Sequence, residues 1–295
     1  MKIKKSFGEK VFDCVNVIIL GILAVITLYP CYYVLIASVS DPVKIYDAGG
    51  LLFWPKDFAL YSYMSVIKNS AVWIGYRNTI FYVIGGTLLS VLLTTSAAFC
   101  GSRRKLPGKN IIMFLIMFTM YFNGGLIPTY LVVKSLGLLN TPLAMIIPTA
   151  ISTYNLIITL SYFRSIPESL EEAAMIDGAS YFRIFYQIMI PLATPIIAVI
   201  SLYYAVAMWN NYFTAMIYIT DKKLIPLQMV LRDILLQSNS MGNDVNNLST
   251  ESGAAAYAMN IRYATIVVST IPILCVYPFI QRYFIKGVMI GAVKG

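Results

Sequence analysis

The chain has 295 residues, of which 59% are hydrophobic and only 12% charged, so it is too apolar for an ordinary soluble domain. We therefore expect an integral membrane protein. Its net charge of +9 does not indicate nucleic acid binding, because the basic residues are not gathered among exposed aromatic residues. The sequence contains no histidine, which excludes Ser-His hydrolysis, histidine metal sites and imidazole acid–base chemistry.

Six apolar runs are each long enough to cross a bilayer core, which takes about 20 residues of helix. They lie at roughly 12–38, 78–101, 110–133, 142–163, 189–217 and 263–281. The sequence thus predicts an all-α, polytopic membrane protein with six transmembrane helices. The first run is too long for a signal peptide, and we expect it to be a retained span.

Lysine and arginine residues predict the orientation of these spans, because cytoplasmic connections carry the excess of basic residues. The excess falls on the N-terminal residues, the connection between the second and third spans, the segment at 164–183 and the C-terminal tail. With six spans both termini share one side. We therefore expect the N- and C-termini and the connection before residue 189 to be cytoplasmic.

The first external segment, residues 40–75, is rich in aromatic residues and shows no clear helical period. Its tryptophan and tyrosines suit a membrane–water boundary, although contact with an external partner is an alternative interpretation. The chain then divides into an N-terminal membrane helix with this segment (1–73), a core (74–281) containing the loop at 165–191, and a cytoplasmic tail (282–295).

The third span contains a helix interruption, because Gly124, Gly125 and Pro128 lie together near its end. A broken helix at membrane depth is tolerated where it is buried in protein or lines a cavity. A kink that allows close helix packing is the alternative. We expect the longest external connection, residues 220–258, to begin with an amphipathic helix and to continue as a polar loop or as a surface for an external protein.

The segment 165–191 is charged and rich in small residues, and it predicts two short helices that meet at a hinge. Ser165 with Glu168, and Ser169 with Glu172, have the spacing of a capping box at a helix start. Glycine adopts backbone angles that other residues resist, so Asp177-Gly178 should break the helix. An aromatic segment, Tyr181 to Ile188, then leads to Pro191. Four residues fall on one side of the first helix at helical spacing: Leu170, Ala173, Ala174 and Asp177. We expect the two alanines to let another surface approach that side closely.

The segment resembles the EAA loop of the membrane-spanning subunits of ABC importers. The resemblance rests on Glu172-Ala173-Ala174, then Gly178 after three residues, then Ile188-Met189-Ile190-Pro191 after nine more, with Ile190 where the family usually has leucine. It implies that this loop is the coupling helix, which sits in a groove of a separate ATPase. The residues that it assigns to ATPase coupling are Glu172, Ala173, Ala174, Asp177, Gly178 and Arg183.

The resemblance covers nearly the whole chain and is greatest to type I permeases for complex oligosaccharides. It implies a second permease subunit in a heterodimer, two ATP-binding subunits and an external substrate-binding protein. ATP and Mg would be held by the ATPase subunits, and this chain would bind no cofactor. It also implies a location in the cytoplasmic (inner) membrane of a bacterium. The tail from Lys286 is expected to touch the ATPases or to act as a basic anchor.

The sequence offers no energy source of its own. Asp13, at the edge of the first run, is the sole acidic or basic residue in the predicted spans, whereas ion-coupled carriers generally need such groups in the membrane. No G-x-x-x-x-G-K-S/T phosphate loop occurs, so we do not expect an enzyme that hydrolyses ATP. A secondary carrier that holds sodium at broken helices stays an alternative. Peptide or amino acid cargo, or a structural or receptor role, are further alternatives.

A sugar needs aromatic faces for stacking and amide or hydroxyl groups for hydrogen bonding. Residues of these types near helix irregularities are the candidate substrate pathway: Tyr121, Asn123, Tyr154, Asn155, Trp209, Asn210, Asn211 and Tyr212. The alternative is that they bond neighbouring helices. No metal site is expected, because the four cysteines, Cys14, Cys31, Cys100 and Cys275, lack metal-ligand spacing.

Overall fold

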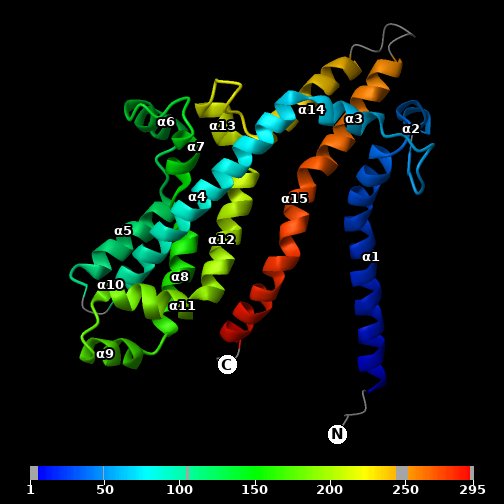
Figure 1. The fold of residues 1–295 in the computed structure, drawn as a ribbon. Coiled ribbons are helices and arrows are strands. Elements are labelled where there is room, and N and C mark those ends of the chain that lie inside the picture. The colour runs from blue at the N-terminus through cyan, green and yellow to red at the C-terminus, as the bar shows by residue number, and fades with distance from the viewer. Residues whose placement is uncertain (1–5, 49, 104–105, 244–251, 293–295) are drawn as a thin grey trace. The chain divides into compact units, whose positions relative to one another are not determined.

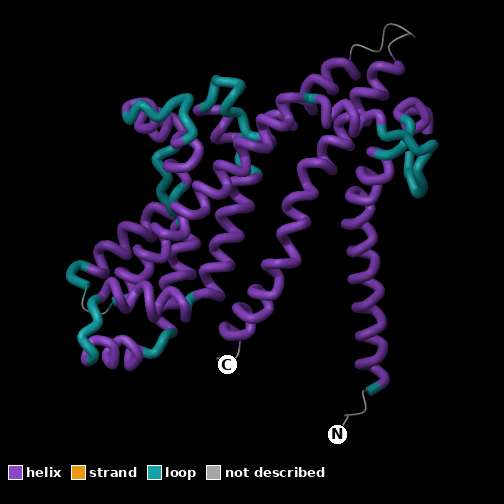
Figure 2. Tube along the Cα trace, in the orientation of Figure 1, coloured by secondary structure: helices purple, strands orange, loops and turns teal. Residues whose placement is uncertain are grey.

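The computed structural model describes residues 6–48, 50–103, 106–243 and 252–292. Within these residues the regular structure is helical, apart from one isolated antiparallel bridge between Ser40 and Phe58 (Figures 1 and 2). The predicted all-α class is therefore confirmed. Predictions that concern 104–105, the polar stretch 244–251 and the side chains of the C-terminal tail lie outside the described part.

Three helices in the described residues are long and apolar enough to cross a membrane without a break. They are α1 (Phe7–Ser38), α4 (Ser70–Ser102) and the Ala256–Cys275 part of α15 (Ser252–Ala292). Three bent helix pairs also qualify when each is taken as one span, which gives up to six. This number agrees with the six apolar runs, but half of the predicted spans are not straight helices.

The chain forms two compact units, Met1–Asn69 with Asp233–Thr270, and Ser70–Arg232 with Ile271–Gly295. We call them the N-terminal unit and the central unit. This division follows contact density, and the functional boundaries at 73 and 281 stay predictions.

Asn260 is the polar centre of the N-terminal unit and is only 2% exposed. Its Nδ2 donates to the carbonyl oxygens of Ala37 at 2.8 Å and Ser40 at 3.1 Å, and its Oδ1 accepts from Ser62 Oγ. Because the last carbonyls of a helix have no partner inside that helix, Asn260 completes the end of α1. It also ties α1 to α3 through Ser62.

The segment 40–75 is more helical than its sequence pattern indicated. It forms α2 (Pro42–Ala48), α3 (Tyr61–Lys68) and the start of α4, which begins at Ser70 rather than near residue 78. Helices this short are marginal alone and depend on tertiary contacts. Val66 and Ser62 of α3 are buried, which supplies such contacts and explains why local periodicity missed the helix.

In the central unit, α4 packs along α8 (Thr153–Ser165) and α12 (Thr194–Trp209) (Figure 1). The face of α4 toward them carries small and polar residues, as is usual between membrane helices. Tyr204 of α12 joins all three helices, because its hydroxyl hydrogen-bonds Thr94 Oγ1 at 2.7 Å and accepts from the Ser152 amide at 3.0 Å. Beyond α12, α14 (Leu227–Asn243) confirms the expected helix after residue 224.

The third span is broken where the sequence predicted. The helices α5 (Lys109–Tyr121) and α6 (Leu126–Ser135) meet at 116°, and Gly125 has a φ of 87°. Pro128, however, lies in the first turn of α6 and does not cause the break. Proline is tolerated there because the first amides of a helix have no intrahelical acceptor.

The fourth and fifth spans are also bent. In the fourth, α7 (Leu143–Ile146) with the 3₁₀ turn η1 (Ile147–Thr149) meets α8 at 53°. In the fifth, the helix that ends at Leu192 meets α12 at 81°, and a further break at 210–212 precedes α13 (Phe213–Tyr218). The single span expected at 189–217 is therefore wrong in its bounds, since apolarity does not record the direction of a helix axis.

Candidate functional site

The segment 165–191 forms α9 (Glu168–Ile176), α10 (Tyr181–Ile184), the π turn η2 (Phe185–Met189) and α11 (Ile190–Leu192). The two predicted short helices are present, but the predicted caps are wrong. Pro167 precedes α9 and makes no side-chain cap, and Ser169 lies inside the helix. Ser165 is the last residue of α8, and its Oγ donates to the Tyr162 carbonyl at 2.7 Å.

Gly178 ends α9 as predicted, with a φ of 78°. Its amide donates to the Met175 carbonyl at 3.0 Å, and the Ala179 amide donates to the Ala174 carbonyl at 2.9 Å. These two bonds are a Schellman motif, which satisfies carbonyls at the end of the helix. A Cβ at Gly178 would meet no atom within 4 Å, so backbone conformation rather than crowding requires glycine here.

A new helix begins directly after this turn, because Ser180 Oγ accepts from the Arg183 amide at 3.4 Å as an N-cap. Arg183 Nε donates to Gln187 Oε1 at 2.8 Å on the outer side. The helix continues through the π turn and past Pro191, and Ala193 then lies at the bend before α12. Such π turns occur frequently at functional sites.

The two alanines of α9 have different environments. Ala173 is exposed, as are Glu172, Asp177, Gly178 and Arg183. Ala174 is only 8% exposed and packs in an apolar cluster of the chain itself. The expectation that both alanines form one docking side is therefore corrected, because Ala174 is covered by this chain.

Apolar side chains of α9 and α10 are also exposed. Ile176 of α9 is 86% exposed and Phe182 of α10 is 72% exposed, and the exposed Tyr181 also lines the cleft beside Arg103. Large exposed apolar side chains are typical of a surface that contacts another protein. The exposed residues of the segment therefore include both polar and apolar groups.

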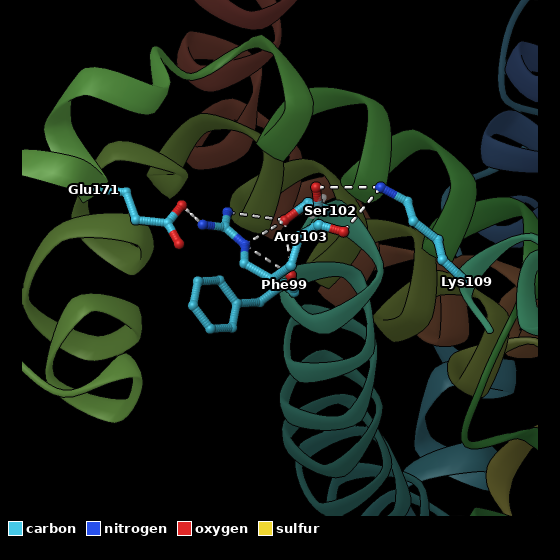
Figure 3. Close-up of polar contacts among 5 residues, drawn as sticks. All are labelled: Phe99, Ser102, Arg103, Lys109 and Glu171. Carbon is cyan, nitrogen blue, oxygen red and sulfur yellow. Dashed lines mark hydrogen bonds and ion pairs between the residues drawn. The ribbon is translucent and has the colours of Figure 1, made fainter. Parts of the chain in front are cut away.

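An ion pair joins α9 to the end of α4. Arg103, directly after α4, pairs through Nη1 with Glu171 Oε2, and both side chains are 17% exposed (Figure 3). Nε and Nη2 of Arg103 donate to Ser102 Oγ at 3.2 and 2.9 Å, and Nε also approaches the Phe99 carbonyl at 3.3 Å. The guanidinium carbon lies 4.5 Å from the centre of the Phe99 ring, within the range of a cation–π contact.

Burial lowers the pKa of Arg103, and the nearby Tyr181 and Glu168 act in the opposite direction. An arginine in a protein nevertheless stays protonated, so the positive charge persists at physiological pH. Lys109 supports the same turn, because its Nζ donates to the carbonyls of Arg103 at 3.0 Å and Ser102 at 3.5 Å.

Sequence reasoning missed both members of this pair. Arg103 was counted only among the basic residues that predict the orientation of the spans, and Glu171 was not singled out. One signal was present: Glu171 precedes Ala174 by three residues and so shares its face of the helix. Without knowledge that Ala174 is buried, that spacing did not separate Glu171 from its neighbour Glu172.

A cleft of about 470 Å³ lies between the end of α4 and the start of α9. Its charged lining is mixed and contains Arg103, Lys109 and Arg164 together with Glu168, Glu171 and the exposed Glu172. Mixed charge does not indicate a site for one simple ion. Among the described residues, no group of three or more His, Cys, Asp or Glu side chains is placed to hold a metal.

The eight candidate pathway residues fall in three places. Tyr121 and Asn123 lie at the break between α5 and α6, where Asn123 Oδ1 accepts from the Gly125 amide at 2.9 Å. Tyr154 and Asn155 begin α8; the Tyr154 ring is exposed and lies 6.4 Å from the ring of Tyr203, whereas Asn155 is buried.

The remaining four lie at the end of α12. Trp209 is buried, its ring lies 6.3 Å from that of Tyr76, and its Nε1 has no hydrogen-bond partner among the described residues. Asn210 and Tyr212 are exposed, and Asn211 Oδ1 accepts from the Thr214 amide at 3.2 Å. In the described part of the chain, no hydrogen bond or ring contact joins the three groups, and their role in a pathway stays a prediction.

Comparisons with known proteins identify the family of this chain and several relatives. A model of the family described as "Binding-protein-dependent transport system inner membrane component" matches residues 71–290. The chain is 42% identical over 287 residues to the polygalacturonan/rhamnogalacturonan transport system permease protein YtcP of Bacillus subtilis (strain 168), covering 97% of this chain and 99% of the relative. It is 41% identical over 286 residues to protein LplC of the same organism, covering 97% and 96%.

A solved structure is also similar to this chain. It is that of a bacterial ABC transporter involved in the import of the acidic polysaccharide alginate. The TM-score is 0.85 and the identity 35%, with 96% of this chain and 100% of that chain covered. The likeness therefore includes the sequence and extends over the whole fold.

Proposed function

The chain belongs to the family of binding-protein-dependent transport system inner membrane components, and we infer from this that it is the permease subunit of a carbohydrate ABC importer. The observation that supports this function is α9, which carries Glu172 and Ala173 of the EAA sequence at exposed positions and ends at the turn of Gly178. The chain is thus a transport component that moves oligosaccharides across the membrane, not an enzyme.

The relatives favour sugar over the alternative cargoes, peptides and amino acids. YtcP is named for polygalacturonan and rhamnogalacturonan, and the solved neighbour for alginate. Polygalacturonan, like alginate, is an acidic polysaccharide. We propose that oligosaccharides containing uronic acids are the first substrates to test, with neutral oligosaccharides as the second class.

Energy would come from partner subunits. We propose two ATP-binding subunits that hold ATP and Mg, a second permease that completes a heterodimer, and an external substrate-binding protein. The absence of a phosphate loop from the sequence supports this division, because the chain has no Walker-type site for nucleotide. The orientation with both termini cytoplasmic, which places α9 on the ATP side, is part of the proposal and rests on the distribution of basic residues.

The free side of 165–191 would form the coupling contact. Glu172 would pair with a cationic group of the ATPase, Ala173 would permit close approach, and Gly178 would set the angle between α9 and α10. Asp177 and Arg183 lie beside them on the same exposed surface. Ala174, on the buried side of α9, would pack this helix against the rest of the chain. The cytoplasmic tail, 282–295, is proposed to touch the same ATPases.

Transport would follow from movement of these segments. Closure of the two ATPases on ATP would draw the two coupling segments of the heterodimer together and open the membrane cavity outward. The external protein would then deliver its sugar, and hydrolysis would reverse the change. The breaks at 122–125 and 210–212, with the pathway residues beside them, are proposed to line that cavity.

Reconstitution tests the proposal. The chain with its partner subunits, in vesicles that contain ATP, should accumulate labelled oligogalacturonate, and vesicles without ATP should not. Accumulation by the isolated chain would instead support a secondary carrier. A deletion strain whose uptake of every oligosaccharide is unchanged would point to a structural or receptor role.

A further inference from the structure

The coupling segment is joined to the rest of the central unit in two ways. Its two ends continue into α8 and, through α10 and α11, into α12, whereas its inner face contacts the end of α4 without a chain connection. Taking the proposed function of α9 as given, we propose that the Arg103–Glu171 ion pair is the tie that makes α4 follow the coupling helix during transport. Arg103 is thus a positioning residue that acts through Glu171.

Contacts other than the ion pair with Glu171 already orient the side chain of Arg103. Two of its nitrogens donate to Ser102 Oγ, Nε is also directed at the Phe99 carbonyl, and the guanidinium lies over the Phe99 ring. All of these contacts belong to the end of α4 (Figure 3). Since the guanidinium is planar and already oriented, little further freedom is lost when Nη1 binds the carboxylate.

The apolar contact beside the ion pair is small. Ala174 contributes a single methyl group from α9 to the apolar cluster, which Phe99 enters from α4 and Phe185 from η2. The rings of Phe99 and Phe185 lie 5.0 Å apart. This layer allows α9 to slide over the end of α4, because apolar contact is not directional. The charged pair, in contrast, fixes one point of α9 to one point of α4.

The helix α4 is suited to carry movement over a distance. It has 33 residues without a break, which corresponds to about 50 Å at 1.5 Å per residue. Near its other end, Asn78 Nδ2 donates to the carbonyls of Lys223 at 2.7 Å and Ile225 at 3.0 Å, and Tyr82 Oη donates to that of Leu224 at 2.7 Å. A shift of Arg103 would therefore reach the connection before α14, on the proposed external side.

Single substitutions in the assembled transporter should separate transport from ATP hydrolysis. In Arg103→Ala and Glu171→Ala we expect uptake of labelled oligogalacturonate per ATP hydrolysed to fall about tenfold, which equals about 1.4 kcal/mol of coupling. Co-purification with the ATPase subunits should be unchanged, because the docking side of α9 is intact. Amide hydrogen exchange in 168–176 should rise, since α9 loses its tie.

Rescue distinguishes a specific pair from a general structural effect. The double reversal Arg103→Glu with Glu171→Arg should recover part of the uptake per ATP, because the charges attract again although the contacts that orient Arg103 are lost, and Arg103→Lys should also recover part, because lysine keeps the charge but loses the fork geometry. The matched control is Arg164→Ala. Arg164 lines the same cleft but forms no ion pair among the described residues, so its replacement should leave coupling unchanged.

Several results would overturn the tie. They are normal uptake per ATP in both alanine variants, an equal loss in Arg164→Ala, loss of ATPase co-purification in Arg103→Ala, or failure of the double reversal to recover coupling. Unchanged hydrogen exchange at 168–176 would also contradict it, and that measurement does not depend on transport. A failure of the proposed function itself would appear in the unsubstituted complex, as absent or ATP-independent uptake.

Discussion

The turn at Gly178 allows the sharpest prediction. Its φ of 78° lies in the left-handed region, where an ordinary L-residue costs about 1–2 kcal/mol. A Cβ there meets no atom within 4 Å, so Gly178→Ala should destabilise the turn only by this conformational free energy. Gly178→Asn should destabilise the turn less than alanine does, because asparagine tolerates left-handed angles. Gly178→Pro cannot reach this φ at all and also removes the amide that donates to the Met175 carbonyl.

We therefore expect uptake to decrease in the order glycine, asparagine, alanine, proline, with a reduction of about tenfold for alanine and no detectable uptake for proline. The assay is ATP-dependent uptake in the assembled transporter, with membrane insertion and ATPase co-purification measured in parallel. Insertion should be normal in all variants because the apolar spans are unchanged. Normal uptake with normal ATPase assembly in Gly178→Pro would refute the reasoning, as would an alanine variant less active than proline.

Three further predictions test other parts of the molecule. Ala173→Trp should abolish ATPase co-purification without lowering insertion, because Ala173 is on the exposed side of α9; pull-down from membranes measures this, and normal recovery of the ATPase would contradict it. Asn260→Ala removes the donor to the buried Ser40 carbonyl and one of the two donors to the Ala37 carbonyl, which also accepts from the Ser40 amide, and should destabilise the N-terminal unit by about 2 kcal/mol, seen as a lower melting temperature in detergent. In Asn210→Cys, a transported oligosaccharide should slow thiol labelling if the break after α12 lines the pathway; equal labelling with and without sugar would exclude this residue.

Features that depend on a few adjacent residues could be predicted from the sequence. Gly178 and Gly125 both adopt the positive φ that marks a helix break, and no distant contact is needed to foresee it. The Ser165 cap failed for a related reason. The end of α8 and the start of α9 are separated by only two residues, and the local pattern does not show which helix the hydroxyl serves.

Features that depend on direction or on distant segments could not be predicted. The apolar run at 189–217 predicts a span, but its composition does not give the 81° bend after Leu192, where Ala193 is fully buried. In the sequence, Asn260 is one polar residue in an apolar stretch and shows no sign of a special role. Its importance appears only when the end of α1 and the side chain of Ser62 are brought against it.

The sequence by itself determined the membrane class, the helical architecture, the family and the position of the hinge at Gly178, because apolarity, glycine conformation and the EAA spacing are local properties of the chain. Tertiary structure alone decided which side of α9 is free. Ala174 is covered because it joins an apolar cluster with residues of other segments, such as Phe99 and Phe185, and Glu171 meets Arg103 only because α9 folds back onto the end of α4. Burial and ion pairing are relations between distant residues, and spacing along one helix does not encode them.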